Sequence, residues 1–266
     1  MTEQTSKPVA VVTGAAGDIG AAIGEQLAET YTIAAVDMDQ DSLEKVVRSL
    51  QEKGLKATAL PFDLTNADSL CELAASARSL GPIEVLINNA GAASALSLHQ
   101  MTRENLAKDI GLNLEAALNC FKMFEDDLIA CGHASVVNIA SVNGLGTYGH
   151  PAYSAAKAGL IHATKALAVE YGKYGLRANA VAPGTVKTQA WKLRQSENPQ
   201  VFEEALRWYP FKALPEPADI AQAVAFLLSP AARCITGVCL PVDSGLSAGS
   251  PALPRTFTQS PDFDGT

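Results

Sequence analysis

A tyrosine and a lysine four residues apart form the most suggestive chemical pair in this chain. Tyr153 and Lys157 open a predicted helix in the stretch Tyr-Ser-Ala-Ala-Lys, and this spacing places both side chains on one helix face. A free phenol has a pKa of about 10, and a nearby ammonium favours the phenolate. The pair therefore predicts a group that exchanges a proton with a substrate alcohol, although isolated pairs of this kind are common on solvated helices.

Two further polar residues are expected beside this pair. The preceding strand ends in Asn-Ile-Ala-Ser, so Ser141 falls at the carboxyl end of the sheet, where open α/β folds bind ligands. Its hydroxyl can hold the substrate oxygen, or it can simply cap a turn. Asn113 lies within a predicted helix, where Asn is a mediocre helix former, and this invites a functional reason for its presence.

A glycine-rich turn near the amino terminus predicts a dinucleotide site. Residues 13–20 read Thr-Gly-Ala-Ala-Gly-Asp-Ile-Gly between a strand and a helix, whose free N–H groups can receive a pyrophosphate. Such a turn also occurs for packing reasons alone. The second strand ends at Asp37, where a carboxylate can bond both ribose hydroxyls and repel a 2′-phosphate, or else cap a turn. We therefore predict NAD as the cofactor, in preference to NADP.

The third and fourth strands end in further candidate contacts. Asp63 and Leu64 can hold the adenine amine and ring, although Asp63 can also cap a helix. The fourth strand ends in Asn-Asn-Ala-Gly, residues 88–91, which let the backbone pass close to adenosine or form a simple turn.

Alternating apolar strands and amphipathic helices must position these residues. The pattern predicts an α/β chain, a single-domain Rossmann fold with a doubly wound, seven-stranded parallel sheet flanked by helices. The predicted strands are 9–12, 32–36, 56–61, 85–88, 135–139, 177–181 and 238–242. The predicted helices are 19–28, 43–53, 67–80, 103–130, 153–171 and 218–228.

Two segments stand apart from this pattern. Within a catalytic domain of residues 1–249, residues 188–217 form a long insertion that predicts a substrate lid, and residues 250–266 predict an extended tail. In and beside the lid, Trp191, Trp208 and Tyr209 can wall an apolar pocket, and His150 either lines that pocket or is incidental. The lid region also carries cations that either meet an anionic group or are solvated: Lys187, Lys192, Arg194 and Arg207.

Composition narrows the classes of partner. A net charge of -8 disfavours nucleic acid and anionic membranes, and no apolar run is long enough to span a bilayer. We expect a small-molecule partner and a cytoplasmic location. The five cysteines are an odd number without a Cys-x-x-Cys pair, and no histidines cluster near them at ligand spacing, so we expect reduced thiols and no metal site.

Together, these marks make residues 9–245 resemble the short-chain dehydrogenase/reductase family. The resemblance also rests on Pro183-Gly184-Thr185-Val186-Lys187-Thr188. It implies that Tyr153 is the general acid/base and that Ser141 orients the substrate. It further implies that Lys157 binds the nicotinamide ribose and lowers the tyrosine pKa, and that Asn113 holds a water of the proton relay. The implied cofactor contacts are Gly14, Gly17, Asp18, Ile19, Gly20, Asp37, Asp63, Leu64, Asn89, Ala90, Gly91, Tyr153, Lys157, Pro183, Gly184, Val186 and Thr188.

The chain departs from the family pattern at two positions. Asp18 occupies the place of the middle glycine of the turn, and its charge is unwelcome near a pyrophosphate unless it points to solvent or caps the helix. Ser244 stands where the family often has glycine. The family also implies a homotetramer or homodimer.

The combined prediction is an NAD(H)-dependent oxidoreductase that interconverts a secondary alcohol and its ketone. The alcohol is a small hydroxy compound, a polyol or a cyclic alcohol, and oxidation to give NADH is the favoured direction. An NADPH-dependent ketone or 3-oxoacyl reductase is the alternative within enzymes, but no basic residue follows the second strand before Lys45. A dinucleotide sensor without catalysis is the alternative from another class.

Overall fold

One parallel sheet organises the computed structural model, which describes residues 7–66, 69–250 and 252–263. Its seven strands lie in the order β3-β2-β1-β4-β5-β6-β7. The strands are β1 (Val9–Thr13), β2 (Thr32–Asp37), β3 (Ala57–Pro61), β4 (Ile83–Asn88), β5 (Ser135–Ile139), β6 (Arg177–Pro183) and β7 (Cys239–Val242). The predicted fold class and sheet are confirmed, and the strand order reverses between β1 and β4, where such folds bind ligands.

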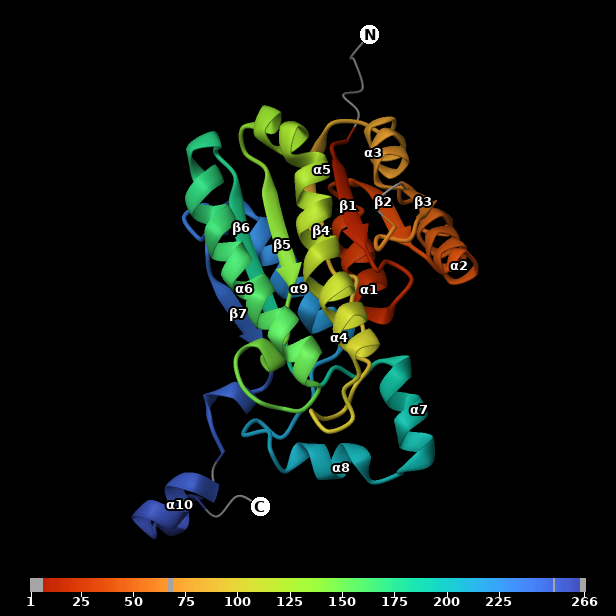
Figure 1. The fold of residues 1–266 in the computed structure, drawn as a ribbon. Helices are drawn as coiled ribbons and strands as arrows, with labels where there is room; N and C mark the ends of the chain where they lie inside the picture. The colour runs from red at the N-terminus through yellow and green to blue at the C-terminus, as the bar shows by residue number, and fades with distance from the viewer. Residues whose placement is uncertain (1–6, 67–68, 251, 264–266) are drawn as a thin grey trace.

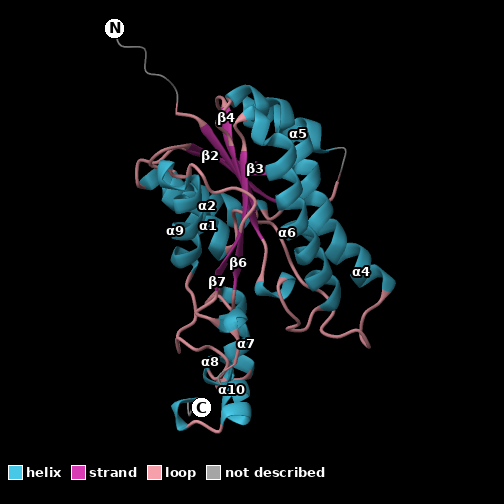
Figure 2. Ribbon diagram, turned by 90° about the vertical axis from the view of Figure 1, so that its left-hand side faces the viewer, coloured by secondary structure: helices cyan, strands magenta, loops and turns pink. Residues whose placement is uncertain are grey.

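The central strands are buried on both sides because helices cover both faces of the sheet. All five residues of β1 and all five of β5 are buried. Helices α1 (Asp18–Leu27), α2 (Gln40–Glu52) and α9 (Pro217–Leu228) cover one face. The other face is covered by α3 (Leu70–Arg78), α5 (Ala116–Cys131) and α6 (Pro151–Tyr171) (Figure 2). The predicted start of the third helix, Ala67, lies outside the described residues.

The single helix predicted for residues 103–130 is interrupted. It consists of α4 (Arg103–Ile110), a π-helical turn (Gly111–Glu115) and α5. The Asn113 side chain donates to the carbonyl of Asp109 at 2.8 Å, and this carbonyl would accept the backbone N–H of Asn113 in a regular α-helix. The competition accounts for the widened turn, a feature often found at functional sites.

The lid segment lies at the carboxyl edge of the sheet. Helices α7 (Gln189–Glu197) and α8 (Val201–Leu206) lie below the strand ends in Figure 1. Among the described residues, no helix is long and apolar enough to cross a membrane.

The carboxyl-terminal segment differs from the extended tail predicted for residues 250–266. It contains helix α10 (Ala252–Thr258) and a 3₁₀ turn (Pro261–Phe263) within its described part. Thr256 and Thr258 return hydrogen bonds to the carbonyls of Ala252 and Pro254, and a proline in the first turn costs no helical hydrogen bond. Composition alone therefore misrepresented this segment.

Candidate active site

The tyrosine and lysine lie on the first two turns of α6, facing the end of β5. Lys157 Nζ is 5.6 Å from the centroid of the Tyr153 ring and donates to the Ile139 carbonyl at 2.7 Å. Ser141 lies two residues after the end of β5 and is 8% exposed, while Lys157 is only 3% exposed. The structure thus brings the three predicted groups together at the carboxyl edge of the sheet.

Burial dominates the acid–base properties of this pair. Burial raises the pKa of Tyr153 and is the largest effect on it. A hydrogen bond with Ser141 opposes this by lowering the pKa, and the charge of Asp109 raises it further. Burial also lowers the pKa of Lys157 to about 8. Desolvation is therefore the largest effect on the pKa of the phenol, and the lowering expected from Lys157 stays a prediction. Ser141 is the group that favours the phenolate here.

Asn113 is held in one orientation by its amide nitrogen. Nδ2 donates to the carbonyls of Ala92 at 2.7 Å and Asp109 at 2.8 Å. Its buried Oδ1 has no hydrogen-bond partner among the described residues. A Cβ added at Gly91 would lie 2.6 Å from this oxygen and 3.2 Å from Lys157 Nζ. Both polar atoms therefore border the space that glycine leaves open.

Sequence reasoning missed Asn143, which positions Ser141. The Asn143 backbone N–H donates to Ser141 Oγ at 3.2 Å, and its Nδ2 donates to the Gly149 carbonyl at 3.0 Å and to Ser154 Oγ at 3.1 Å. The residue ties the loop after β5 to the first turn of α6. Its position two residues after Ser141 was the available signal.

A cavity of about 460 Å³ lies over the glycine-rich turn. Met38, Phe62, Ala92 and Leu112 also line it, and these apolar residues carry no motif from which they could have been predicted. Twelve predicted cofactor contacts line this cavity: Gly14, Gly17, Asp18, Ile19, Gly20, Asp37, Asp63, Leu64, Asn89, Ala90, Gly91 and Thr188. Their contact with a cofactor stays a prediction.

Close packing against neighbouring backbone requires glycine at two positions of this turn. Gly14 has φ +64°, and a Cβ there would lie 2.8 Å from the Ala90 Cα, while a Cβ at Gly20 would lie 2.2 Å from the Gly14 carbonyl oxygen. At Gly17 the nearest atom would be 3.5 Å away, so packing does not require glycine there. Asp37 accepts a 3.0 Å hydrogen bond from the Ala16 N–H, which joins the end of β2 to the turn.

A second cavity of about 330 Å³ connects the cofactor cavity with the reacting groups. It shares Ile19, Asn89, Gly91 and Thr188 with the first, and Ser141 also lines it. The remaining predicted cofactor contacts line it: Tyr153, Lys157, Pro183, Gly184 and Val186. All predicted cofactor contacts therefore border two adjoining cavities.

A third cavity, of about 740 Å³, opens beyond Tyr153 and Ser141. Trp191, Trp208 and Tyr209 line it as predicted, together with Tyr148, which sequence reasoning missed. Among the described residues that line it, none is Lys, Arg, Asp or Glu.

Of the cations expected to meet an anionic substrate group, those with described side chains do not line the large cavity. Lys187 pairs with Glu216 at 3.3 Å, and Arg207 is exposed and does not line the cavity. The side chains of Lys192 and Arg194 lie outside the described parts of α7.

His150 lines the large cavity beside the tyrosine. Its ring makes an edge contact with Tyr153, with ring centroids 6.5 Å apart. Nδ1 lies 3.1 Å from the Ala95 carbonyl, which can only accept, so Nδ1 carries the proton. Nε2 is thus the nitrogen available to a ligand.

Comparisons with known proteins agree with this arrangement. A family model described as enoyl-(acyl carrier protein) reductase matches residues 14–247. The chain is 35% identical over 251 residues to 2,3-dihydro-2,3-dihydroxybenzoate dehydrogenase of Bacillus subtilis, covering 91% of this chain and 96% of that protein. It is also 35% identical over 251 residues to cis-4-hydroxycyclohexanecarboxylate dehydrogenase of Sinomonas cyclohexanicum, covering 93% and 100%.

A solved structure is similar over nearly the whole length. It is an oxidoreductase of the short chain dehydrogenase/reductase family from Burkholderia thailandensis, 41% identical, with a TM-score of 0.89. The match covers 96% of this chain and 99% of that chain.

Proposed function

This chain belongs to the short-chain dehydrogenase/reductase family of oxidoreductases, and from that premise we propose that it oxidises a neutral cyclic secondary alcohol with NAD. The observation that carries the proposal is the position of Tyr153 and Ser141. Both border the connecting cavity and the large aromatic cavity, so one substrate oxygen can contact both hydroxyls.

In this mechanism the side chains of the protein bind the substrate oxygen and accept its proton. When bound, the nicotinamide ring supplies the hydride acceptor. Ser141 holds the substrate oxygen, and Tyr153 accepts the hydroxyl proton as general base. Lys157 would hold the nicotinamide ribose, and Asn113 Oδ1, which has no hydrogen-bond partner among the described residues, would accept from a water that relays the proton. Because burial raises the pKa of Tyr153, oxidation should accelerate as the pH rises above neutral. Ketone reduction, which needs the protonated phenol, should slow only as the pH nears that raised pKa.

The charges around the cofactor cavity support NAD over NADP. Asp18, Asp37 and Asp63 line it, and its described lining contains no Lys or Arg. Three carboxylates repel a 2′-phosphate, whereas an Asp at the end of β2 suits the free ribose hydroxyls.

The walls of the large cavity support a cyclic substrate without a carboxylate. Aromatic side chains suit a flat or cyclic ring, as in the two relatives whose names include a benzoate and a cyclohexanecarboxylate. Those names also include a carboxylate, yet the described lining of this cavity offers no Lys or Arg to pair with one. We therefore place the substrate among neutral cyclic alcohols.

The test is a substrate panel with both cofactors. Paired neutral and carboxylated cyclic alcohols, with a linear polyol, are assayed by reduced-cofactor absorbance with NAD and with NADP. We expect turnover of the neutral cyclic alcohols with NAD, and loss of turnover by about 10²- to 10⁴-fold in Tyr153→Phe with NADH binding retained. Binding without turnover would support the sensor, and preference for NADP would support the reductase. The homo-oligomeric state and cytoplasmic location stay predictions.

A further inference from the structure

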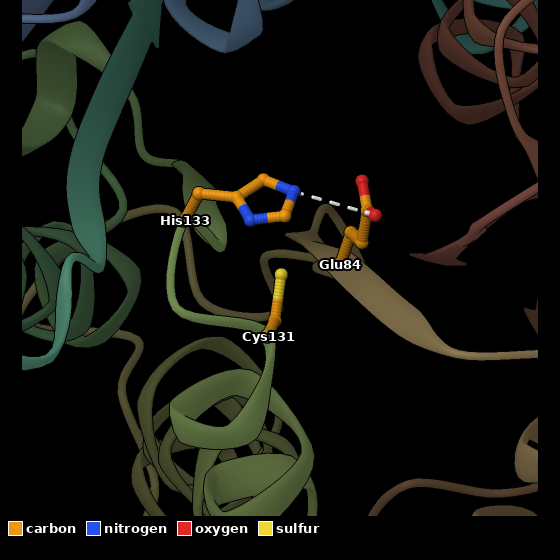
Figure 3. A group of neighbouring side chains, drawn as sticks. All are labelled: Glu84, Cys131 and His133. Carbon is orange, nitrogen blue, oxygen red and sulfur yellow. Dashed lines mark ion pairs between the residues drawn. The ribbon is translucent and has the colours of Figure 1, made fainter.

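Three side chains of metal-ligating type meet at the opposite edge of the sheet from Tyr153. Glu84 is the second residue of β4, Cys131 is the last residue of α5, and His133 precedes β5 (Figure 3). One ligand atom of each lies within 4.8 Å of the other two. Nε2 of His133 is 3.4 Å from a carboxylate oxygen of Glu84.

The fold assembles this group from two distant segments. Gly132 ends α5 with φ +74° and turns the chain toward β5, so that Cys131 and His133 face one site from either side of the glycine. Strand β5 pairs with β4, with Val85 opposite Ser135, and this register brings Glu84 alongside. The sequence led us to expect no metal site because no cluster of histidines lies near the cysteines, and His133, two residues after Cys131, did not enter that expectation.

We propose that Glu84, Cys131 and His133 bind a zinc ion. Zinc takes thiolate, imidazole and carboxylate ligands at about 2.0–2.3 Å, which places tetrahedral ligand atoms about 3.5 Å apart. Small rotations of these side chains suffice, because His133 is 72% exposed at the rim of a cavity of about 360 Å³. The thiolate favours zinc over calcium or magnesium.

The charges of the site match a divalent cation. A thiolate and a carboxylate together balance the two positive charges of zinc, and neutral imidazole adds none. Asp127 also lines the cavity, one turn before Cys131 on α5, and makes the surroundings more acidic. Its carboxylate is bonded to Arg78 at 2.7 Å, so we leave it outside the ligand set and assign the fourth position to water.

The site lies away from the reacting groups, and its role is structural. Zinc would join the start of β4 to the end of α5, and binding to the folded state alone raises the unfolding temperature. The proposal is therefore independent of the proposed function, and its test does not use turnover as the readout.

Zinc binding can be measured directly on the full chain. Chelator-treated protein is titrated with ZnCl₂ by calorimetry and with CoCl₂ by absorbance. We expect one zinc per chain and a thiolate-to-cobalt charge-transfer band. Cys131→Ser should abolish the band, and Glu84→Gln and His133→Ala should each weaken zinc binding by at least about tenfold. Cys71→Ser and His99→Ala, at exposed sites elsewhere, are the matched controls and should change neither.

Two outcomes would overturn the site. One is the absence of stoichiometric zinc binding or of the cobalt band in the parent chain. The other is binding that survives Cys131→Ser, or that depends on Cys71 instead, since either would place the metal elsewhere. Circular dichroism of each variant shows whether it is folded, and His133→Ala, a change at an exposed side chain, keeps the test valid if Cys131→Ser does not fold.

Discussion

The carboxylate of Asp18 accepts a 2.7 Å hydrogen bond from the backbone N–H of Gln189. Asp18 stands in the glycine-rich turn where the family usually has glycine, and Gln189 is the first residue of the lid helix α7. An anion at a helix amino terminus is favourable. The departure from the family pattern is therefore a link between the cofactor turn and the lid.

Replacing Asp18 should separate its two electrostatic effects. Both Asp18→Gly and Asp18→Asn remove a negative charge beside the diphosphate site and should lower the KM for NAD about two- to tenfold. Only Asp18→Gly also removes the acceptor of the Gln189 N–H, so it alone should raise the KM for the alcohol, by about three- to tenfold. Steady-state kinetics with both substrates check this, and equal alcohol KM values in the two variants would contradict the link.

The preference for NAD should depend on the charge of Asp37. Asp37→Asn keeps an oxygen that can accept from the Ala16 N–H but no longer repels a 2′-phosphate. The ratio of kcat/KM for NAD to that for NADP should fall at least about tenfold, which corresponds to about 1.4 kcal/mol. Asp63→Asn is the matched control, and it should keep more of the preference for NAD than Asp37→Asn does. An unchanged ratio in Asp37→Asn would assign the discrimination to other residues.

A methyl group at Gly91 should obstruct the space between Asn113 and Lys157. The new Cβ would lie 2.6 Å from Asn113 Oδ1, closer than such atoms approach, so Asn113 must move. We expect Gly91→Ala to lower kcat about 10- to 100-fold with a melting temperature close to the parent. Gly172→Ala, where no atom lies within 4 Å of the added Cβ, is the control. Unchanged kcat would exclude a role for this space.

Local patterns predicted the sheet well, because strands buried on both faces are largely apolar runs. They also singled out the candidate reacting groups, because the motifs follow strand ends, and the roles of these groups stay predictions. The same patterns did not predict the π-helical turn at Asn113, because it depends on a side-chain hydrogen bond to Asp109. The contribution of Leu246 and Ser247 to the large cavity was missed for a related reason. This contribution depends on how segments far apart in the sequence pack together, which no local sequence pattern specifies. The pKa of Tyr153 likewise depends on burial.

Burial of the charged Lys157 side chain should lower the free energy of unfolding of the chain. Its pKa falls from 10.5 to about 8 on folding, so the unfolded chain binds more protons between these two values. The contribution of Lys157 to the free energy of unfolding is therefore unfavourable in full below about pH 8 and is relieved as the pH rises toward 10.5. The full relief amounts to about 3 kcal/mol.

Lys157→Met isolates this contribution from the other titrating groups. It should abolish most turnover, and it also leaves the Ile139 carbonyl without the lysine hydrogen bond, so its absolute stability is not the readout.

The readout is the free energy of unfolding of Lys157→Met minus that of the parent, measured by urea denaturation from pH 7 to 10.5. This difference should fall by about 2–3 kcal/mol across the range, because the parent alone gains stability as Lys157 loses its proton. Lys165→Met, at an exposed position on the same helix, provides the control. If the difference for Lys157→Met stays constant with pH, burial does not disfavour the charged form of Lys157. The lysine would then keep its charge beside Tyr153 as readily as it does in water.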